Sequence, residues 1–350
     1  MPETPDVRVR SPLVELTLAR LRELLREPEA IFWVFVFPIV LAGILGLAFR
    51  SRPPEPLPVA VVDGPRAAER LTALTAGGGL VASVLPEAEA RQALVRGRVV
   101  LVVSAAEPPA YVYDPTQPES RAARMAVDAA LQKAAGRADA FTPERVEIVE
   151  PGTRYVDFLV PGLLGMNLMG TGMWGIGFSL VVARNGKLLK RLVAAPARRS
   201  HILAAQILSR LLFLVPEAAA LLLFAYFLLD VPLRGSVLLL TSVSVLGAMA
   251  FSGLGLLTAA RPRTIEGVSG LMNVVMVPMW VFSGIFFSTE RFPAALQPFI
   301  QALPLTALND ALRGVMLDGA GVAALGSELA LLAGWGAVSF VAAVRIFRWH

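Results

Sequence analysis

Long apolar stretches alternate with short polar segments along most of the chain. The first apolar stretch covers residues 30–49 and holds twenty residues without a charge. At about 1.5 Å of rise per residue, a helix of that length reaches about 30 Å, the thickness of the bilayer hydrocarbon core. The pattern predicts a polytopic α-helical membrane protein with six transmembrane helices. The five later stretches lie near residues 156–183, 201–229, 235–260, 265–288 and 322–344.

Residues 50–154 follow a different pattern, with 13 Lys/Arg, 13 Asp/Glu and only short apolar runs. The runs at residues 59–62, 99–103 and 111–113 predict strands, because β-branched and aromatic side chains fit a half-buried pleated surface. A helix is expected after the first run and a longer one over residues 120–138. Strands that alternate with helices predict a small α/β domain between the first and second transmembrane helices.

Residues 1–29 predict a cytoplasmic tail followed by an amphipathic helix. A Ser-Pro step at residues 11–12 is a typical helix start, since proline suits the first helical position. The leucines fall on one face and the charged residues mostly elsewhere, as in the segment with Leu21, Arg22, Leu25 and Arg26. We expect this helix to lie at the membrane surface, with an ordinary solvated helix as the alternative.

Residues 289–321 are apolar but interrupted by Pro293, Pro298 and Pro304. No uninterrupted piece is long enough to cross a membrane. Irregular backbone at membrane depth must be buried in protein or face water. The segment therefore predicts short external re-entrant helices in the outer leaflet.

Positive charges gather in the segment Arg184–Arg199, which holds six Lys/Arg and no acidic residue. Under the positive-inside rule, residues 184–200 form a cytoplasmic loop, both termini are cytoplasmic and residues 50–154 are external. The expected location is the cell membrane, inner or plasma. Orientation in the membrane explains the net charge of +5 and the pI near 10 better than a nucleic-acid partner does.

A few polar residues lie inside or beside the apolar stretches. Glu217 follows Pro216 within the third stretch, where a carboxylate normally faces protein or water. It is a candidate for a proton or substrate contact, or for a structural hydrogen-bond partner near a proline kink. Asn273 is a weaker candidate in the fifth stretch. Asp310 and Arg313 are three residues apart and can pair on one helix face, either as a structural contact or in substrate gating.

Several kinds of site are not expected. The chain has no cysteine and two histidines, so no metal site is predicted. The pattern Gly170-x-Gly172-x-x-Gly175 lies inside an apolar stretch without a preceding strand, so it favours helix packing over dinucleotide binding. The nucleotide-binding P-loop motif G-x-x-x-x-G-K-[ST] does not occur. Residues that could form a catalytic site do not cluster in any region of the sequence, so no enzyme activity is predicted for this chain.

Three stretches in this order resemble the ABC-2-type transporter permeases, the membrane subunits of type V ABC exporters. The first stretch is FLVPG at residues 158–162, where the second transmembrane helix opens. The second is the basic segment RNGKLLKRLVAAPARRSHILAAQILSRLL, which begins at Arg184. The third runs from Gly284-Ile285-Phe286-Phe287 through Pro304-Leu305-Thr306 to Asp310-Ala311-Leu312-Arg313.

The resemblance implies that this chain is a transport subunit without a cofactor of its own. ATP and Mg would be bound by separate ABC ATPase subunits on the cytoplasmic face. A second permease copy, identical or related, would complete the pathway, with membrane lipids as further partners and no nucleic acid. The cargo would be an amphiphilic drug, lipid or peptide moved out of the cytoplasm or inner leaflet.

The resemblance also assigns roles to residues. The amphipathic helix becomes the connecting helix, through Leu21, Arg22, Leu25 and Arg26. Lys187 stands where many members of the family have Thr or Ser, and the usual acidic residue of this turn is absent. The segment that receives work from the ATPase holds Arg184, Lys187, Leu188, Lys190, Arg191, Leu192, Pro196, Arg198 and Arg199.

Two other functions stay open on the sequence. A secondary transporter would use Glu217 as a proton carrier and need no ATP. A membrane-anchored sensor would bind its ligand through the external α/β domain.

Overall fold

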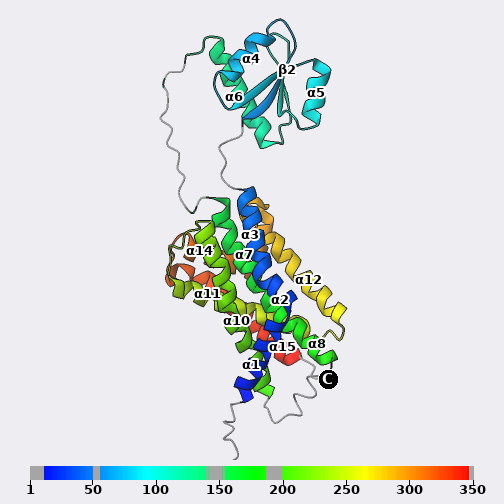
Figure 1. The fold of residues 1–350 in the computed structure, drawn as a ribbon, viewed down its shortest axis with the longest axis vertical. Coiled ribbons are helices and arrows are strands. Elements are labelled where there is room, and N and C mark those ends of the chain that lie inside the picture. The colour runs from blue at the N-terminus through cyan, green and yellow to red at the C-terminus, as the bar shows by residue number, and fades with distance from the viewer. Residues whose placement is uncertain are drawn as a thin grey trace, which may run out of the picture. The chain divides into compact units, whose positions relative to one another are not determined.

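The computed structural model describes residues 12–49, 56–138, 141, 152, 154–186 and 199–346. The chain divides into two compact units (Figure 1). The smaller unit is Ser51–Ile148, and the larger unit combines Met1–Arg50 with Val149–His350.

The smaller unit is built on a four-stranded sheet in the order β2-β1-β3-β4. Strand β1 pairs in parallel with both β2 and β3, while β4 is antiparallel to β3. The strands are β1 Leu57–Val62, β2 Leu80–Leu85, β3 Leu101–Val103 and β4 Tyr111–Tyr113. The predicted strands at residues 59–62, 99–103 and 111–113 are therefore present.

Alternating side chains of β1 face two different sets of helices. Val59 and Val61 pack in one cluster with Leu74 of α4 (Ala67–Thr75) and Val127 of α6 (Pro118–Ala134). Ala60 and Val62 pack in a second cluster with Ala90 and Ala93 of α5 (Glu87–Val95). The period of two along a strand thus places helices on both faces of the sheet.

The larger unit is helical. The first apolar run is continuous helix from Pro28 to Ala48, with a π-helical turn at η1. Two long helical segments of the larger unit are composite: α2 Pro28–Ile31 continues into η1 Phe32–Val36 and α3 Phe37–Ala48, and α7 Tyr155–Gly172 continues into η2 Met173–Phe178 and α8 Ser179–Asn185. The other long helices of this unit are α1 Pro12–Arg26, α10 Arg199–Leu228, α11 Val237–Ala259, α12 Ile265–Phe282, α14 Pro304–Met316 and α15 Gly326–Ile346.

Five helical segments of the described chain are long and apolar enough to cross a membrane. They are Tyr155–Asn185, Leu208–Leu228, Val237–Ala259, Ile265–Phe282 and Val322–Ile346. The apolar helix Phe32–Ala48 occupies the place of the first predicted span but is shorter, so a sixth span stays a prediction. The fifth predicted span was too long, because α12 ends at Phe282 and Gly284 then turns the chain with φ +70°.

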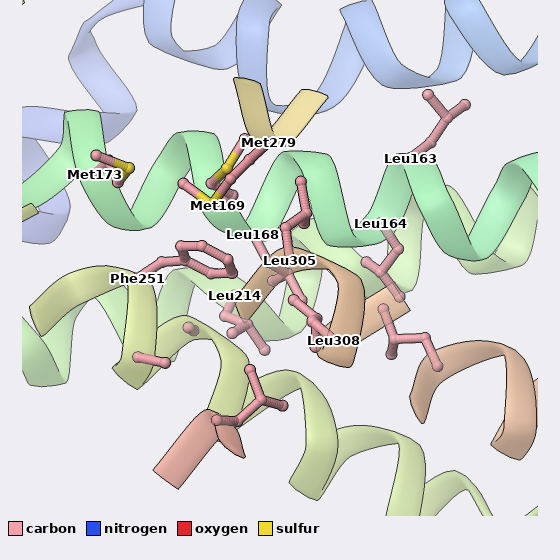
Figure 2. Close-up of a cluster of buried hydrophobic side chains, with 14 of the residues drawn as sticks. Leu163, Leu164, Leu168, Met169, Met173, Leu214, Phe251, Met279, Leu305 and Leu308 are labelled. Carbon is pink, nitrogen blue, oxygen red and sulfur yellow. The ribbon is translucent and has the colours of Figure 1, made fainter. Parts of the chain in front are cut away.

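Helix α11 is central to the helical unit and packs against α7, η2, α14 and α15. The buried side chains labelled in Figure 2 come from α7, η2, α10, α11, α12 and α14. Phe251 of α11 is fully buried, and a side-chain carbon at Gly172 would lie 2.8 Å from its Cβ. Gly172 is thus a packing glycine, as the apolar surroundings of the Gly170-x-Gly172-x-x-Gly175 pattern predicted.

Residues 289–316 form short helices, none of them long enough to cross a membrane. Helix α14 packs against α7, α11, α12 and α15 and is the longest of the group. The others are η3 Thr289–Arg291, η4 Ala294–Leu296 and α13 Gln297–Gln301, with η5 Val322–Leu325 before α15. Their place in the outer leaflet stays a prediction.

Candidate functional site

A buried ion pair lies within α10. Arg210 Nη2 donates to Glu217 Oε2 at 2.6 Å, and the two side chains are 7% and 0% exposed. Seven residues are about two helical turns, so both side chains share one face of α10. Pro216 stands beside Glu217 and cannot donate a backbone hydrogen bond, a usual cause of local bending.

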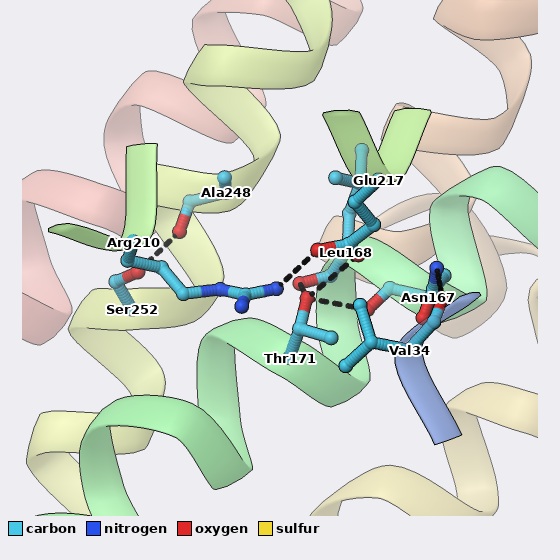
Figure 3. Close-up of polar contacts among 8 residues, drawn as sticks. All are labelled: Val34, Asn167, Leu168, Thr171, Arg210, Glu217, Ala248 and Ser252. Atoms are coloured by element: carbon cyan, nitrogen blue, oxygen red, sulfur yellow. Dashed lines mark hydrogen bonds and ion pairs between the residues drawn. The ribbon is translucent and has the colours of Figure 1, made fainter. Parts of the chain in front are cut away.

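The pair is part of a network that joins three helical segments (Figure 3). Thr171 Oγ1 of α7 lies 3.2 Å from Glu217 Oε1 and 2.7 Å from the carbonyl oxygen of Asn167, one turn earlier. Asn167 Nδ2 donates to the carbonyl oxygen of Val34 in the π-helical turn η1, at 3.0 Å. The network therefore links the first apolar helix, α7 and α10.

A second polar cluster surrounds Arg313 of α14. Its guanidinium lies 3.8 Å from the centre of the Phe158 ring and donates to the carbonyl oxygens of Phe158 and Gly284. Asp310 Oδ1 is 3.5 Å away from Arg313 Nη1 and its side chain is half exposed. The predicted Asp310–Arg313 pair is confirmed, but the closest partners of Arg313 are backbone carbonyls of α7 and of the turn after α12.

Neighbouring residues strengthen the same junction. Asn309 Nδ2 donates to the carbonyl oxygen of Ser283 at 2.8 Å, and Tyr155 Oη donates to the carbonyl oxygen of Phe286 at 3.0 Å. A side-chain carbon at Gly162 would lie 2.8 Å from the carbonyl oxygen of Ile285. Two of the three stretches that carry the family resemblance, residues 158–162 and 284–313, thus contact each other directly.

The start of α7 is held by a third cluster. Arg154 Nη2 donates to Asp157 Oδ1 at 2.8 Å and to the carbonyl oxygen of Asp230 at 2.6 Å. Asp157 is fully buried and also accepts from the backbone nitrogen of Gly152 at 2.8 Å. Its hydrogen bond raises the pKa of Arg154 above the ordinary value, because the carboxylate favours the charged guanidinium.

The basic segment is described only at its two ends. Arg184 near the end of α8 donates from Nη1 to the carbonyl oxygen of Pro262, between α11 and α12, at 3.0 Å. Arg199 begins α10. The other predicted coupling residues lie outside the described residues: Lys187, Leu188, Lys190, Arg191, Leu192, Pro196 and Arg198.

The predicted connecting helix is α1, which packs against α10. Leu21 is half-buried, whereas Leu25 is 61% exposed and Arg22 and Arg26 are exposed. Helix α10 therefore covers part of the apolar face of α1 and leaves Leu25 uncovered. An exposed leucine on an amphipathic helix fits a position at the membrane surface.

Asn273 lies on the exposed face of α12, beside Val274, which is 70% exposed, and Val277. Within the part of the chain that the structure describes, its side chain has no hydrogen-bond partner. The same described residues hold no group of three or more His, Asp or Glu that could bind a metal ion.

Sequence reasoning named Glu217, Asp310 and Arg313 but missed most of their partners. Arg210 carried a usable signal, because it lies inside the apolar third span and two helical turns before Glu217. Asn167, Thr171 and Asn309 carried none, since single neutral polar residues are common in membrane helices and their partners are distant in sequence.

Comparison with known proteins gives consistent matches. A family model described as ABC-2 family transporter protein matches residues 28–345. The chain is 28% identical over 172 residues to ABC transporter G family member 20 of Dictyostelium discoideum, covering 49% of this chain and 24% of that protein.

Two relatives come from Escherichia coli strain K12. The probable multidrug ABC transporter permease YbhS is 24% identical over 200 residues, which are 54% of this chain and 52% of that one. The inner membrane transport permease YadH is 28% identical over 156 residues, 43% of this chain and 57% of that one. The matched part of the chain thus spans little more than half the length of these two relatives.

Proposed function

This chain belongs to the ABC-2 family of transporter proteins, and from that premise we propose that it is the membrane-spanning permease subunit of an ATP-driven ABC exporter. The proposed cargo is an amphiphilic molecule such as a drug, lipid or peptide, moved out of the cytoplasm or the inner leaflet. The word multidrug in the name of the relative YbhS supports this class of cargo.

The observation that carries the proposal is the buried network between α7 and α10. These helices flank the basic segment 184–200, α7 through its extensions η2 and α8. Thr171, near the end of α7, and the Arg210–Glu217 pair in the middle of α10 bind the two helices to each other. A push on the segment between them would therefore move both helices together rather than separate them.

The push would come from ATPase subunits that bind ATP and Mg. No P-loop motif occurs in this sequence, so ATP binding by that motif requires another polypeptide. In the proposed complex, Leu188 and Leu192 enter an apolar groove on the ATPase, and Arg191 and Arg198 pair with acidic residues at its rim. Helix α1 lies beside this contact because it packs against α10.

The pathway would be completed by a second permease copy, identical or related. Helix α12 supports this arrangement, because it exposes Asn273 within an apolar surface. A polar side chain in a membrane span normally faces protein or a watery cavity rather than lipid. The exposed face of α12 is thus the proposed lining between the two copies.

Glu217 has a structural role in this proposal. Its carboxylate is held by Arg210 and Thr171 and lies next to Pro216, so its oxygens already have partners. A proton carrier would need to alternate between two sides of the membrane, and the ion pair opposes that. We likewise assign Asp310 and Arg313 to the junction between α14 and α7 rather than to gating.

The proposed orientation follows the positive charges. Both termini and residues 184–200 are on the cytoplasmic side of the cell membrane, and the α/β unit is external. The short positively charged connection between α11 and α12, with Arg261 and Arg263, is on the cytoplasmic side in the same arrangement.

The test is ATP hydrolysis by the reconstituted complex with its ATPase. Leu188→Asp and Arg191→Glu should each abolish stimulation of hydrolysis by cargo while the permease still inserts and folds. Leu188→Ile, and Arg263→Glu in the other cytoplasmic connection, serve as matched controls and should retain stimulation. A permease that never copurifies with an ABC ATPase, or unchanged stimulation in both variants, would contradict the proposal.

A further inference from the structure

Strand β2 lies at the edge of the sheet in the smaller unit and is bonded on one side only. The backbone nitrogen of Leu57 donates to the carbonyl oxygen of Gly79 at 2.9 Å. That of Asp63 donates to the carbonyl oxygen of Leu85, also at 2.9 Å. Peptide groups along a strand point alternately to its two sides, so every second residue of β2 has its N–H and C=O directed away from β1. These residues are Leu80, Ala82 and Val84.

The two edges of the sheet differ in how they are protected. Strand β4 has only three residues, and Pro108 and Pro109 lie shortly before it. Short strands and prolines are usual ways to keep a sheet edge from pairing with another chain. Strand β2 has six residues, LVASVL, with no charge and no proline. Val81 is 55% and Val84 36% exposed, so this edge is open to a further strand.

A second copy of β2 fits this edge in the antiparallel direction. With Ala82 on the twofold axis, it lies opposite Ala82 of the second copy, and Leu80 lies opposite Val84 of that copy. Opposed residues whose amide groups face each other exchange both of their N–H···O bonds. Leu80 and Val84 also form an apolar pair across the two strands. The same row of residues serves both copies, as an isologous twofold contact requires.

The ends of β2 leave room for this pairing. A side-chain carbon at Gly77, Gly78 or Gly79 would meet nothing within 4 Å. In the register centred on Ala82, Gly78 lies opposite Pro86 of the second copy. Pro86 has no N–H to donate, and Gly78 leaves the strand conformation with φ +65°. The ladder therefore ends there on both sides, in open space.

The size and the charge of the edge favour a second copy as its occupant. One strand from each side is a small contact beside the roughly 1,200–2,000 Å² of a stable interface. Two copies held in one membrane meet at a raised effective concentration, so a small contact suffices for them. The edge itself has no charge with which to attract and select a different protein.

We propose that β2 pairs with β2 of a second, identical copy, so that the two four-stranded sheets become one continuous sheet. This inference rests on the proposed two-copy transporter and makes that transporter a homodimer. A related but different permease would have to present the same open row of residues. The contact joins the smaller units of the two copies and does not involve the ATPase.

The test is disulfide crosslinking of the full-length protein in its membrane. The chain has no cysteine, so one introduced cysteine reports one contact. In the proposed pair, the Cα atoms of the two Ala82 residues are about 5.5 Å apart, within the range of about 4.4–6.8 Å that a disulfide spans. Under mild oxidation, Ala82→Cys should form a linked dimer at least about tenfold faster than cysteines that meet only by collision. Val95→Cys on α5 and Met125→Cys on α6 provide that reference, because these side chains are 88% and 68% exposed.

A second substitution blocks the pairing without touching β1. The N–H of Val84 points away from β1, so Val84→Pro removes no bond of the sheet, and edge strands tolerate proline. Added to Ala82→Cys, it should lower crosslinking about tenfold, whereas Val84→Ile should leave it unchanged. Val84→Lys, a charge at the edge, is the substitute if the proline variant does not fold.

Three outcomes would overturn the inference. Equal crosslinking of Ala82→Cys and Val95→Cys would mean that β2 has no preferred contact with its copy. A linked product with the mass of another protein would show that the edge takes a foreign strand. The mass of the unmodified protein in nanodiscs separates the remaining failures. A dimer without the Ala82→Cys link overturns the pairing of β2 alone, and a monomer overturns the two-copy transporter as well.

Discussion

Two arginines of the helical unit, Arg210 buried and Arg313 largely buried, are paired in different ways. Arg210 forms an ion pair with the carboxylate of Glu217 on its own helix, and 2.6 Å separates Arg210 Nη2 from Glu217 Oε2. Arg313 binds the backbone carbonyl oxygens of Phe158 and Gly284, which belong to other segments, and its nearest carboxylate is half exposed and 3.5 Å away. Both arginines hold α7 in place, Arg210 near its end through Glu217 and Thr171, and Arg313 near its start.

The difference shows what each cluster requires. The stability of the Arg210–Glu217 pair depends on both charges being present together. Replacing both residues by apolar ones should change the stability little, because such an exchange of a buried pair is often neutral. Arg313 needs the planar guanidinium itself, because its partners are backbone oxygens that no mutation can remove. We expect the first cluster to serve communication between helices and the second to fix the junction of α14 with α7.

The largest effect should come from Arg210→Leu alone. Glu217 would remain as an uncompensated buried charge, which costs about 3–5 kcal/mol of unfolding free energy. Unfolding by detergent titration, followed by circular dichroism, measures this loss. Leu208→Ala on the exposed side of the same helix is the control, and an equal loss there would show that α10 is merely sensitive to substitution.

Arg313→Leu should follow, with a loss of about 2–4 kcal/mol, since two part-buried carbonyl oxygens lose their donor at about 1–2 kcal/mol each, the lower part of the usual range. The same unfolding assay applies. Adding Asp310→Leu should restore none of the loss, because Asp310 is half exposed and is a minor partner. Recovery in that double variant would mean that Arg313 acts as an ordinary ion-pair residue and that the two clusters are alike.

The double variant Arg210→Leu with Glu217→Leu should regain most of the stability lost in Arg210→Leu, to within about 1 kcal/mol of the unmodified protein. Cargo-stimulated ATP hydrolysis in the reconstituted complex should nevertheless fall, because α7 and α10 no longer share the network. Full stimulation in this stable variant would show that the network contributes to folding and not to communication.

Thr171→Val should lower the free energy of unfolding less, by about 1 kcal/mol. Valine has nearly the shape of threonine, so the substitution removes only one neutral hydrogen-bond donor. Asp310→Asn should have the smallest, below about 1 kcal/mol, as expected for a partly exposed ion pair. Measured side by side in the unfolding assay, the two values rank the network above the surface pair. A reversed ranking would contradict the assignment of the buried network as the main link between α7 and α10.

In the smaller unit, three of four strands and the long helix were predictable, and β2 and α5 were not. Strand β2 is a half-exposed edge strand that follows three glycines and contains Ala82 and Ser83, so its apolar pattern is weak. Helix α5 buries little more than Ala90 and Ala93, so it presents no broad apolar face. Both elements depend on packing against β1, which local patterns do not show.

The sequence by itself determined where the apolar helices lie, because bilayer thickness sets the length of an uncharged run and positive charges mark its ends. It also placed the basic segment between two long helices and indicated the family through three short stretches. These properties are local in the chain or depend on order along it, so no knowledge of contacts was needed.

Tertiary structure alone decided which polar groups meet. Thr171 reaches Glu217 across 46 residues, Asn167 reaches Val34 across 133, and Arg313 reaches Phe158 across 155. A buried polar group needs a hydrogen-bond partner, but the amino-acid sequence does not show on which helix that partner lies. The choice depends on how closely glycines such as Gly162 and Gly172 let the helices approach, and that is a property of the packed molecule.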